Sequence, residues 1–149
     1  MLARAGGIPR RETPSESEGH AAQEFGPHGS YAYLAGTTGG SYYWPGGWNI
    51  WSNGYIEDTV QFPTSGLYEF QVVARGSYAG LKWPTMEVRV DQQVIAKVTV
   101  NSKNWKTFTV SGNVSAGSHR VEIAFTNDYY KPPTEDRNLY VDKVKITTK

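Results

Sequence analysis

Apolar and polar residues alternate strictly in several short segments of the chain. In residues 66–76, Tyr68, Phe70, Val72 and Ala74 fall on one face, while charged and amide side chains fall on the other. The same two-residue period recurs in the segments 54–62, 86–91, 94–100, 105–112, 119–126 and 139–146, and a short run at 31–34 adds one more strand. No window shows a convincing helical period, so the sequence predicts an all-β protein.

Turn residues separate these segments at intervals of about 8 to 12 positions, which is typical of sandwiches and barrels. The connections have the length of hairpins, so we expect antiparallel sheets in a jelly-roll-like β-sandwich. A chain of 149 residues suffices for one hydrophobic core. Residues 1–22 combine Gly, Pro, Ser and both charge signs with almost no apolar period, so they predict a disordered tail or linker before a domain at 23–149.

The charge of the chain is nearly balanced, with 15 Lys and Arg against 14 Asp and Glu. This balance provides no electrostatic field to attract nucleic acid or an anionic membrane. No segment reaches the roughly 20 apolar residues of a membrane span, and the absence of cysteine excludes disulfides and thiolate metal sites. We expect a monomeric, secreted module of a larger protein, whose signal peptide is not in this chain.

Carboxylates gather near the C-terminus, in the stretch FTNDYYKPPTEDRNLYVDKVKI (125–146). If antiparallel strands flank the loop, Asp128 at its entrance lies close to Glu135, Asp136 and Asn138 at its exit. Calcium takes six to eight oxygen ligands of these kinds in flexible geometry. A loop that simply exposes its acidic residues to water is an equally good interpretation of the spacing.

A catalytic interpretation of the same carboxylates requires Asp128 and Asp136 to flank a scissile glycosidic bond. A sandwich of this size leaves little material for a deep cleft. The three histidines, His20, His28 and His119, are dispersed, and neither a zincin motif nor a serine hydrolase elbow occurs. His119 lies within a strand pattern, which is more typical of a packed or surface histidine than of a catalytic base.

Three stretches of the chain resemble a known family. WPTMEVRVD (83–91), SAGSHRVEIAFTND (115–128) and EDRNLYVDKVKI (135–146) are similar to the calcium-dependent xylan-binding carbohydrate-binding modules of families 60 and 36, relatives of the family 6 and 35 sandwich modules. The resemblance is best from about residue 66 to residue 146. It implies a noncatalytic module in which a bound calcium ion contacts vicinal hydroxyls of xylan or a related polysaccharide.

The resemblance also implies roles for particular residues. Asp128 and Asp136 would be side-chain ligands of calcium next to the sugar, Glu135 would be a third, and backbone carbonyls near Arg137 would complete the shell. The loop 75–84 would face the same site. Our candidates for stacking against a sugar ring are Trp83 and Tyr129; anchoring of the loop is an equally good role for Trp83.

Asp142 is predicted to have a different role. The two-residue period places it on the same face as Val144 and Ile146, where an unpaired carboxylate is costly. Related sandwich modules hold a structural calcium between such a residue and N-terminal glutamates, for which Glu24 is the only good match here. Arg75 or a backbone amide is an alternative partner.

The aromatic stretch SYYWPGGWNIW (41–51) has two interpretations. It forms either an additional sugar platform with Trp44 and Trp48 exposed, or a cap on the sandwich. For the whole chain, calcium-dependent glycan binding is the first hypothesis. The alternatives are a structural or adhesive cell-surface sandwich that calcium stabilises, and a small glycan-active hydrolase.

Overall fold

A computed structural model describes residues 22–25, 40–42 and 48–149 of the chain. Within these residues the chain forms the following strands: β1 (Ala22–Phe25), β2 (Gly40–Tyr42), β3 (Trp48–Ile50), β4 (Gly54–Phe62), β5 (Gly66–Gly76), β6 (Thr85–Val90), β7 (Gln93–Thr99), β8 (Lys106–Val114), β9 (Gly117–Phe125), β10 (Tyr129–Lys131), β11 (Glu135–Arg137) and β12 (Leu139–Thr148). This part of the chain contains no helix with the length and hydropathy of a membrane span.

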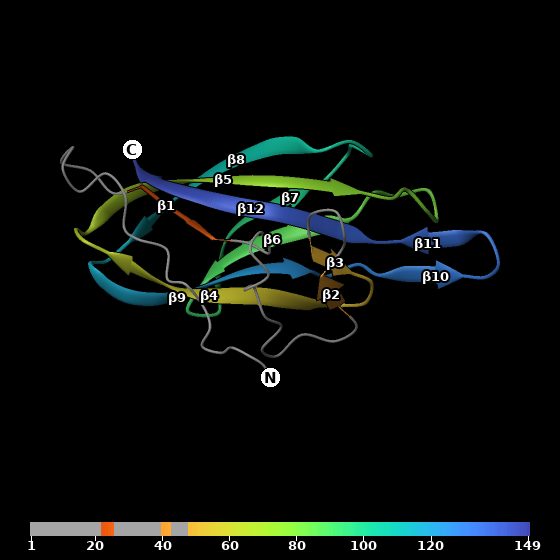
Figure 1. The fold of residues 1–149 in the computed structure, drawn as a ribbon, viewed down its shortest axis with the longest axis horizontal. Coiled ribbons are helices and arrows are strands. Elements are labelled where there is room, and N and C mark those ends of the chain that lie inside the picture. Colours follow the sequence, from red (N-terminus) through yellow and green to blue (C-terminus); the bar gives the residue numbers. More distant parts are fainter. Residues whose placement is uncertain (1–21, 26–39, 43–47) are drawn as a thin grey trace.

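The strands form two antiparallel sheets that lie as layers against each other (Figure 1). One sheet has the order β2-β3-β12-β5-β8, with β1 also paired to β12, and the other has the order β4-β9-β6-β7. The short β10–β11 hairpin projects beyond one end of the two layers (Figure 1). The predicted antiparallel jelly-roll-like β-sandwich is confirmed.

The core lies between the two sheets and consists of the apolar positions of the alternating segments. Phe70 and Val72 of β5 face Ile123 and Phe125 of β9, and all four side chains are buried in one cluster with Val144 of β12. Each such side chain contributes about 1.5–3 kcal/mol of transfer free energy when it is fully buried. The two-residue period therefore identified the faces of these strands correctly.

Most predicted strands end within two residues of their observed bounds, and β4 matches its prediction at 54–62. The predicted strand at 31–34 lies outside the described residues. So does the predicted tail, except for Ala22, which begins β1.

The period-two prediction is wrong at Asp142. The pairing of β12 with β5 shifts register between Val141 and Lys143, so Asp142 is the extra residue of a β-bulge. Val141 and Val144 are both buried, while Asp142 and Lys143 between them are only partly buried. Because the bulge resets the alternation, Asp142 does not share the inward face of Val144.

The aromatic stretch 41–51 contributes two strands to the edge of the first sheet, β2 and β3. Trp48 is only 7% exposed and packs in the core with Ile50, so the sugar-platform alternative is wrong in its exposed Trp48. Trp51 just beyond β3 is exposed, and Trp44 lies outside the described residues. Within this stretch, Trp48 and Ile50 thus belong to the core of the sandwich.

Candidate functional site

The segment predicted to be a loop between Asn127 and Asn138 is a β-hairpin. Strand β10 pairs with β11 in the register Tyr129↔Arg137, Tyr130↔Asp136 and Lys131↔Glu135, and the Pro-Pro turn joins the two strands. The prediction missed these strands because each has only three residues, too few for a period to appear. The hairpin continues from the end of β9 and leads into β12 (Figure 1).

Alternation along this hairpin separates its side chains into two groups. The loop-facing side comprises Tyr129, Lys131, Glu135 and Arg137. The open side comprises Tyr130 and Asp136, together with Asp128 and Asn138, which lie one residue beyond the last pair. A hydrogen bond of 3.1 Å from Asn138 Nδ2 to Asp136 Oδ2 agrees with their place on one side.

The loop-facing side holds the connection between β5 and β6. The backbone N–H of Gly80 donates to Glu135 Oε1 at 2.6 Å. Gly80 has a φ of +61°, and a Cβ at this position would lie 2.8 Å from the Tyr129 ring and 2.9 Å from an Arg137 guanidinium nitrogen. A side chain at position 80 would therefore be strained and would push the hairpin away from the loop.

Arg137 joins this loop to the end of β9. Its buried guanidinium donates to the carbonyl oxygens of Ala79, of Lys82 at 3.2 Å and of Asn127 at 2.6 Å. It also lies 5.1 Å from the centre of the Tyr129 ring. A buried charge is costly unless it is hydrogen-bonded, and here neutral carbonyl oxygens satisfy it. Arg137 thus fixes the hairpin through its side chain.

Short hydrogen bonds also fix the backbone beneath the open side. Ser77 Oγ donates to the Asp136 carbonyl oxygen and accepts from the Asn138 N–H, both at 2.8 Å. From the bend just before β4, Asn53 Oδ1 accepts from the Asp128 N–H at 2.8 Å. The three polar residues of the open side therefore sit on a backbone that is held from two directions.

The open side contains oxygen atoms that have no hydrogen-bond donor. Asp128 Oδ1 and Asn138 Oδ1 are buried and have no hydrogen-bond partner among the described residues. Burial raises the pKa of Asp128, and the charge of Asp136 adds to this effect, while the Tyr129 N–H and Arg137 oppose it. Native proteins rarely leave buried polar atoms unpaired, and these two oxygens can still accept from a donor or bind a cation. Carboxylate and amide oxygens fit a hard cation such as calcium.

The predicted ligand set is only partly brought together. Asp128, Asp136 and Asn138 share the open side, but Glu135 points to the loop-facing side and binds Gly80. Within the described residues, no three His, Asp or Glu side chains gather as a metal-binding group. A cation here would therefore rely on two carboxylates together with amide or backbone oxygens.

The two predicted aromatic contacts, Tyr129 and Trp83, both pack against residues of the β5–β6 connection. Tyr129 packs over Gly80 on the loop-facing side, and Trp83 is partly buried with its ring 5.2 Å from the ring of Tyr78. Tyr130, which the sequence analysis missed, is 65% exposed and lies on the open side. Counting two residues on from Asp128 along a strand would have identified it.

The two residues of the predicted structural calcium site lie on paired strands. In the register of β1 with β12, Glu24 pairs with Lys145, three positions along β12 from Asp142. This register does not place Glu24 directly opposite Asp142. The second calcium site stays a prediction.

Comparison with solved structures shows the same fold in carbohydrate-binding modules. A family 36 module of a multidomain xylanase from the hindgut metagenome of Trinervitermes trinervoides matches with a TM-score of 0.66 and 15% identity over 84% of this chain and 95% of that one. A family 36 module in complex with calcium and xylotriose matches with a TM-score of 0.65 and 17% identity over 83% of this chain and 98% of that one.

The C-terminal family 6 module of a marine laminarinase from Zobellia galactanivorans has a TM-score of 0.59 and 18% identity over 85% of this chain and 99% of that one. No curated protein sequence matches the chain. Residues 69–149, more than half of the chain, match the family described as a calcium-dependent, xylan-binding carbohydrate-binding module. The chain therefore belongs to family 60 of the carbohydrate-binding modules, which are noncatalytic.

Proposed function

We propose that this module binds xylan, or a related β-linked glycan, through a calcium ion held on the open side of the β10–β11 hairpin. Asp128, Asp136 and Asn138 would supply side-chain oxygens. The observation that carries the proposal is the pair of buried oxygens, Asp128 Oδ1 and Asn138 Oδ1, that have no hydrogen-bond partner among the described residues. When bound, calcium would offer coordination positions that two vicinal sugar hydroxyls fill in place of water.

The residues of the open side fit a calcium ion both in their chemistry and in the way their backbone is held. All three candidate ligands offer oxygen, which calcium prefers. Two of the candidates are carboxylates that repel each other, Asp128 and Asp136. The attraction of both to a divalent cation between them would outweigh this repulsion. Arg137 and Ser77 hold the backbone in place without using the Asp128 side chain. The protein thus presents these oxygens on a preformed support.

We also assign the apolar contact with the sugar to Tyr130. A flat phenol ring can cover the C–H face of a pyranose, and the Tyr130 ring is the more exposed of the two hairpin tyrosines. Tyr129 and Trp83 instead support the loop below the site. Such a shallow site buries little area, so we expect modest affinity for short oligosaccharides.

The biological setting follows from the family. Carbohydrate-binding modules act as accessory domains, and one structural relative is a domain of a multidomain xylanase. We infer that this module brings an attached enzyme or surface protein to its polysaccharide outside the cell. The interpretation of Asp128 and Asp136 as a hydrolytic pair has no support, since the family is noncatalytic.

Retention of the protein on insoluble xylan, in calcium and in EDTA, tests the proposal. We expect wild-type protein to be retained only in calcium, and the double variant Asp128→Asn with Asp136→Asn to stay unbound in both buffers. Glu69→Gln removes a carboxylate from β5 on the first sheet and serves as the matched control, which should bind like the wild type. Retention in EDTA, or retention of the double variant, would overturn the proposal.

A further inference from the structure

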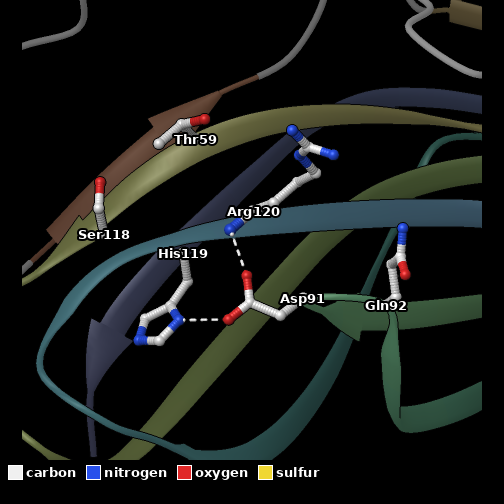
Figure 2. A pocket seen from close by; sticks show the side chains of 6 residues that line it. All are labelled: Thr59, Asp91, Gln92, Ser118, His119 and Arg120. Atoms are coloured by element: carbon white, nitrogen blue, oxygen red, sulfur yellow. Dashed lines mark hydrogen bonds and ion pairs between the residues drawn. The ribbon is translucent and has the colours of Figure 1, made fainter.

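A second polar cluster lies at the end of the sandwich opposite to the β10–β11 hairpin. His119 is near the start of β9 and Asp128 follows its end, so at about 3.3 Å per residue the two lie roughly 30 Å apart. The cluster surrounds a shallow pocket (Figure 2). The pocket is lined by Thr59, Asp91, Gln92, Ser118, His119 and Arg120.

His119 connects two turns that are distant in sequence. Its Nδ1 lies 2.6 Å from Asp91 Oδ2 in the β6–β7 turn, as Figure 2 shows. Its Nε2 lies 2.8 Å from the carbonyl oxygen of Ser115 in the β8–β9 turn, and 3.1 Å from the hydroxyl of the same residue. The ring also meets Phe62 edge-on, with 5.6 Å between the ring centres. The imidazole thus spans two hairpin turns at the end of the core.

The partners of the ring define its protonation state. A carboxylate and a backbone carbonyl are both acceptors, so each ring nitrogen must carry a hydrogen to bond with its partner. A neutral imidazole carries only one, and its other nitrogen would turn a lone pair toward an acceptor. The imidazolium ion satisfies the contacts with Asp91 and the Ser115 carbonyl together, whereas a neutral ring with its hydrogen on Nδ1 keeps the Asp91 bond and can only accept from the Ser115 hydroxyl.

The same three residue types form the triad of serine hydrolases, but the distances disfavour that role. A triad base accepts the serine proton at the nitrogen that faces the hydroxyl. Here Nε2 lies closer to the Ser115 carbonyl oxygen, at 2.8 Å, than to its hydroxyl, at 3.1 Å. A bond to the carbonyl requires Nε2 to carry a hydrogen, which removes it as a base.

The charges around the ring favour the imidazolium form. Among the described residues, Asp91 is the one charged side chain bonded to His119, and its other oxygen accepts from the Arg120 N–H at 2.9 Å. Arg120 on the same strand points its guanidinium to Glu57 of β4, 3.4 Å away. The residue paired with His119 on β4 is the apolar Val60, and Ser115 in the β8–β9 turn is uncharged. The described strands and turns around the ring thus place one anion, the Asp91 carboxylate, in direct contact with it, and this contact favours the charged ring.

We propose that the protonated His119 is a pH-sensitive clasp that ties the β6–β7 turn, through Asp91, to the β8–β9 turn, through Ser115. Loss of the proton leaves Nε2 without a hydrogen for the Ser115 carbonyl. The tie to the β8–β9 turn is then reduced to a bond that Nε2 accepts from the Ser115 hydroxyl, at 3.1 Å. It belongs to the stability of the sandwich and not to the glycan site, so the two can be tested separately.

The effect of pH on stability follows from the shifts of both partners. The hydrogen bond with Asp91 raises the pKa of His119 above its usual 6.5, with burial opposing it. The clasp therefore stabilises the fold fully below about pH 6.5, and this contribution is lost as the pH rises through the folded-state pKa. The Arg120 N–H, then His119, lower the pKa of Asp91, so its contribution is present above about pH 4 and is lost as the pH falls through its lowered pKa.

An NMR titration of the wild-type ring tests the clasp without any substitution. We expect the His119 carbon-bound ring protons to titrate with a pKa above 6.5, and both ring nitrogens to carry hydrogens at about pH 6. A pKa at or below 6.5, or a neutral ring at about pH 6, would overturn the proposal. Substitution of His20 and of His28 identifies the ring signals of these two residues, so that the remaining signals belong to His119.

Unfolding in urea provides the second test. We expect the wild-type midpoint to fall from about pH 6 to about pH 9, and the His119→Gln midpoint to stay level, because glutamine does not titrate. Asp91→Asn should lower the His119 pKa. Retention on xylan in calcium should be equal for wild type and His119→Gln. An unchanged pH slope in His119→Gln, or ester hydrolysis that Ser115→Ala abolishes, would contradict the clasp.

Discussion

The two ends of the sandwich differ in how their carboxylates are satisfied. At the β9 start, both oxygens of Asp91 have donors, the Arg120 N–H at 2.9 Å and His119 at 2.6 Å. At the β9 end, a buried oxygen of Asp128 has no donor within the described residues, although a cationic Arg137 lies close by. Because buried polar atoms are rarely left unpaired, we interpret the first cluster as part of the fold and the second as the proposed ligand site.

The position of the cations explains this difference. His119 directs its Nδ1 at the Asp91 carboxylate. Arg137 instead directs its guanidinium at the backbone carbonyl oxygens of Ala79, Lys82 and Asn127. Arg137 therefore organises the hairpin without neutralising the open side. The carboxylates stay available for a cation from solution.

Substitution of Arg137 should have the largest effect. Arg137→Met leaves three carbonyl oxygens without their donor, at about 1–3 kcal/mol for each one that stays buried. We expect the free energy of unfolding to fall by at least about 3 kcal/mol and xylan binding to be lost. Arg120→Met is the matched control at the other end, where a half-exposed ion pair contributes less than about 1 kcal/mol. Urea unfolding measures both, and equal losses would contradict the comparison.

A methyl group at Gly80 should disturb the support of the hairpin. Gly80→Ala combines a positive φ with a Cβ that would lie 2.8 Å from the Tyr129 ring, whereas Gly117, also at positive φ, has open space around its Cβ position. Both alanine variants should lose stability to backbone strain, because alanine rarely adopts a positive φ. Only Gly80→Ala should also weaken glycan affinity, measured by calorimetry. Equal behaviour of the two variants would show that the loop does not support the site.

Removal of the Asp128 charge should separate binding from stability. Asp128→Asn should reduce glycan affinity in calcium by at least about tenfold, which corresponds to about 1.4 kcal/mol. In EDTA its free energy of unfolding should stay equal to that of the wild type or rise, because the lost charge was partly buried and one of its oxygens had no donor. A large loss of stability in EDTA would mean that Asp128 is a structural residue.

The two hairpin tyrosines should give opposite results. Tyr130→Ala should weaken glycan binding by about tenfold and change the free energy of unfolding by less than about 0.5 kcal/mol, since its side chain is exposed. Tyr129→Ala should chiefly destabilise the protein, because its ring packs on Gly80 and Arg137. Calorimetry and thermal unfolding distinguish the two. The reverse pattern would restore Tyr129 as the sugar contact.

Long alternating segments were predictable from the sequence because many residues report the same face. In β5, Phe70, Val72 and Ala74 repeat one signal, and a single exception would not hide it. The same reasoning failed at Asp142, where one inserted residue reset the alternation within β12. A bulge leaves no mark in hydrophobic periodicity until the partner strand is known.

The candidate site was predictable in position more than in detail. The spacing around the Pro-Pro turn indicated that Asp128 and Asp136 come together, and they share one side of the hairpin. The sequence did not show that Glu135 turns away to bind the Gly80 N–H, since that contact joins residues 55 positions apart. Nor did it show the carbonyl contacts of Arg137, because backbone acceptors have no sequence signature.

The central claim is that calcium and glycan share one site on the open side of the hairpin. Calorimetric titration of xylo-oligosaccharide, in saturating calcium and in EDTA, tests it most directly, paired with titration of calcium in the presence and absence of the sugar. Linkage requires each ligand to raise the affinity for the other by the same factor, which we expect to be at least about tenfold. Sugar affinity that is equal in calcium and in EDTA would contradict the account.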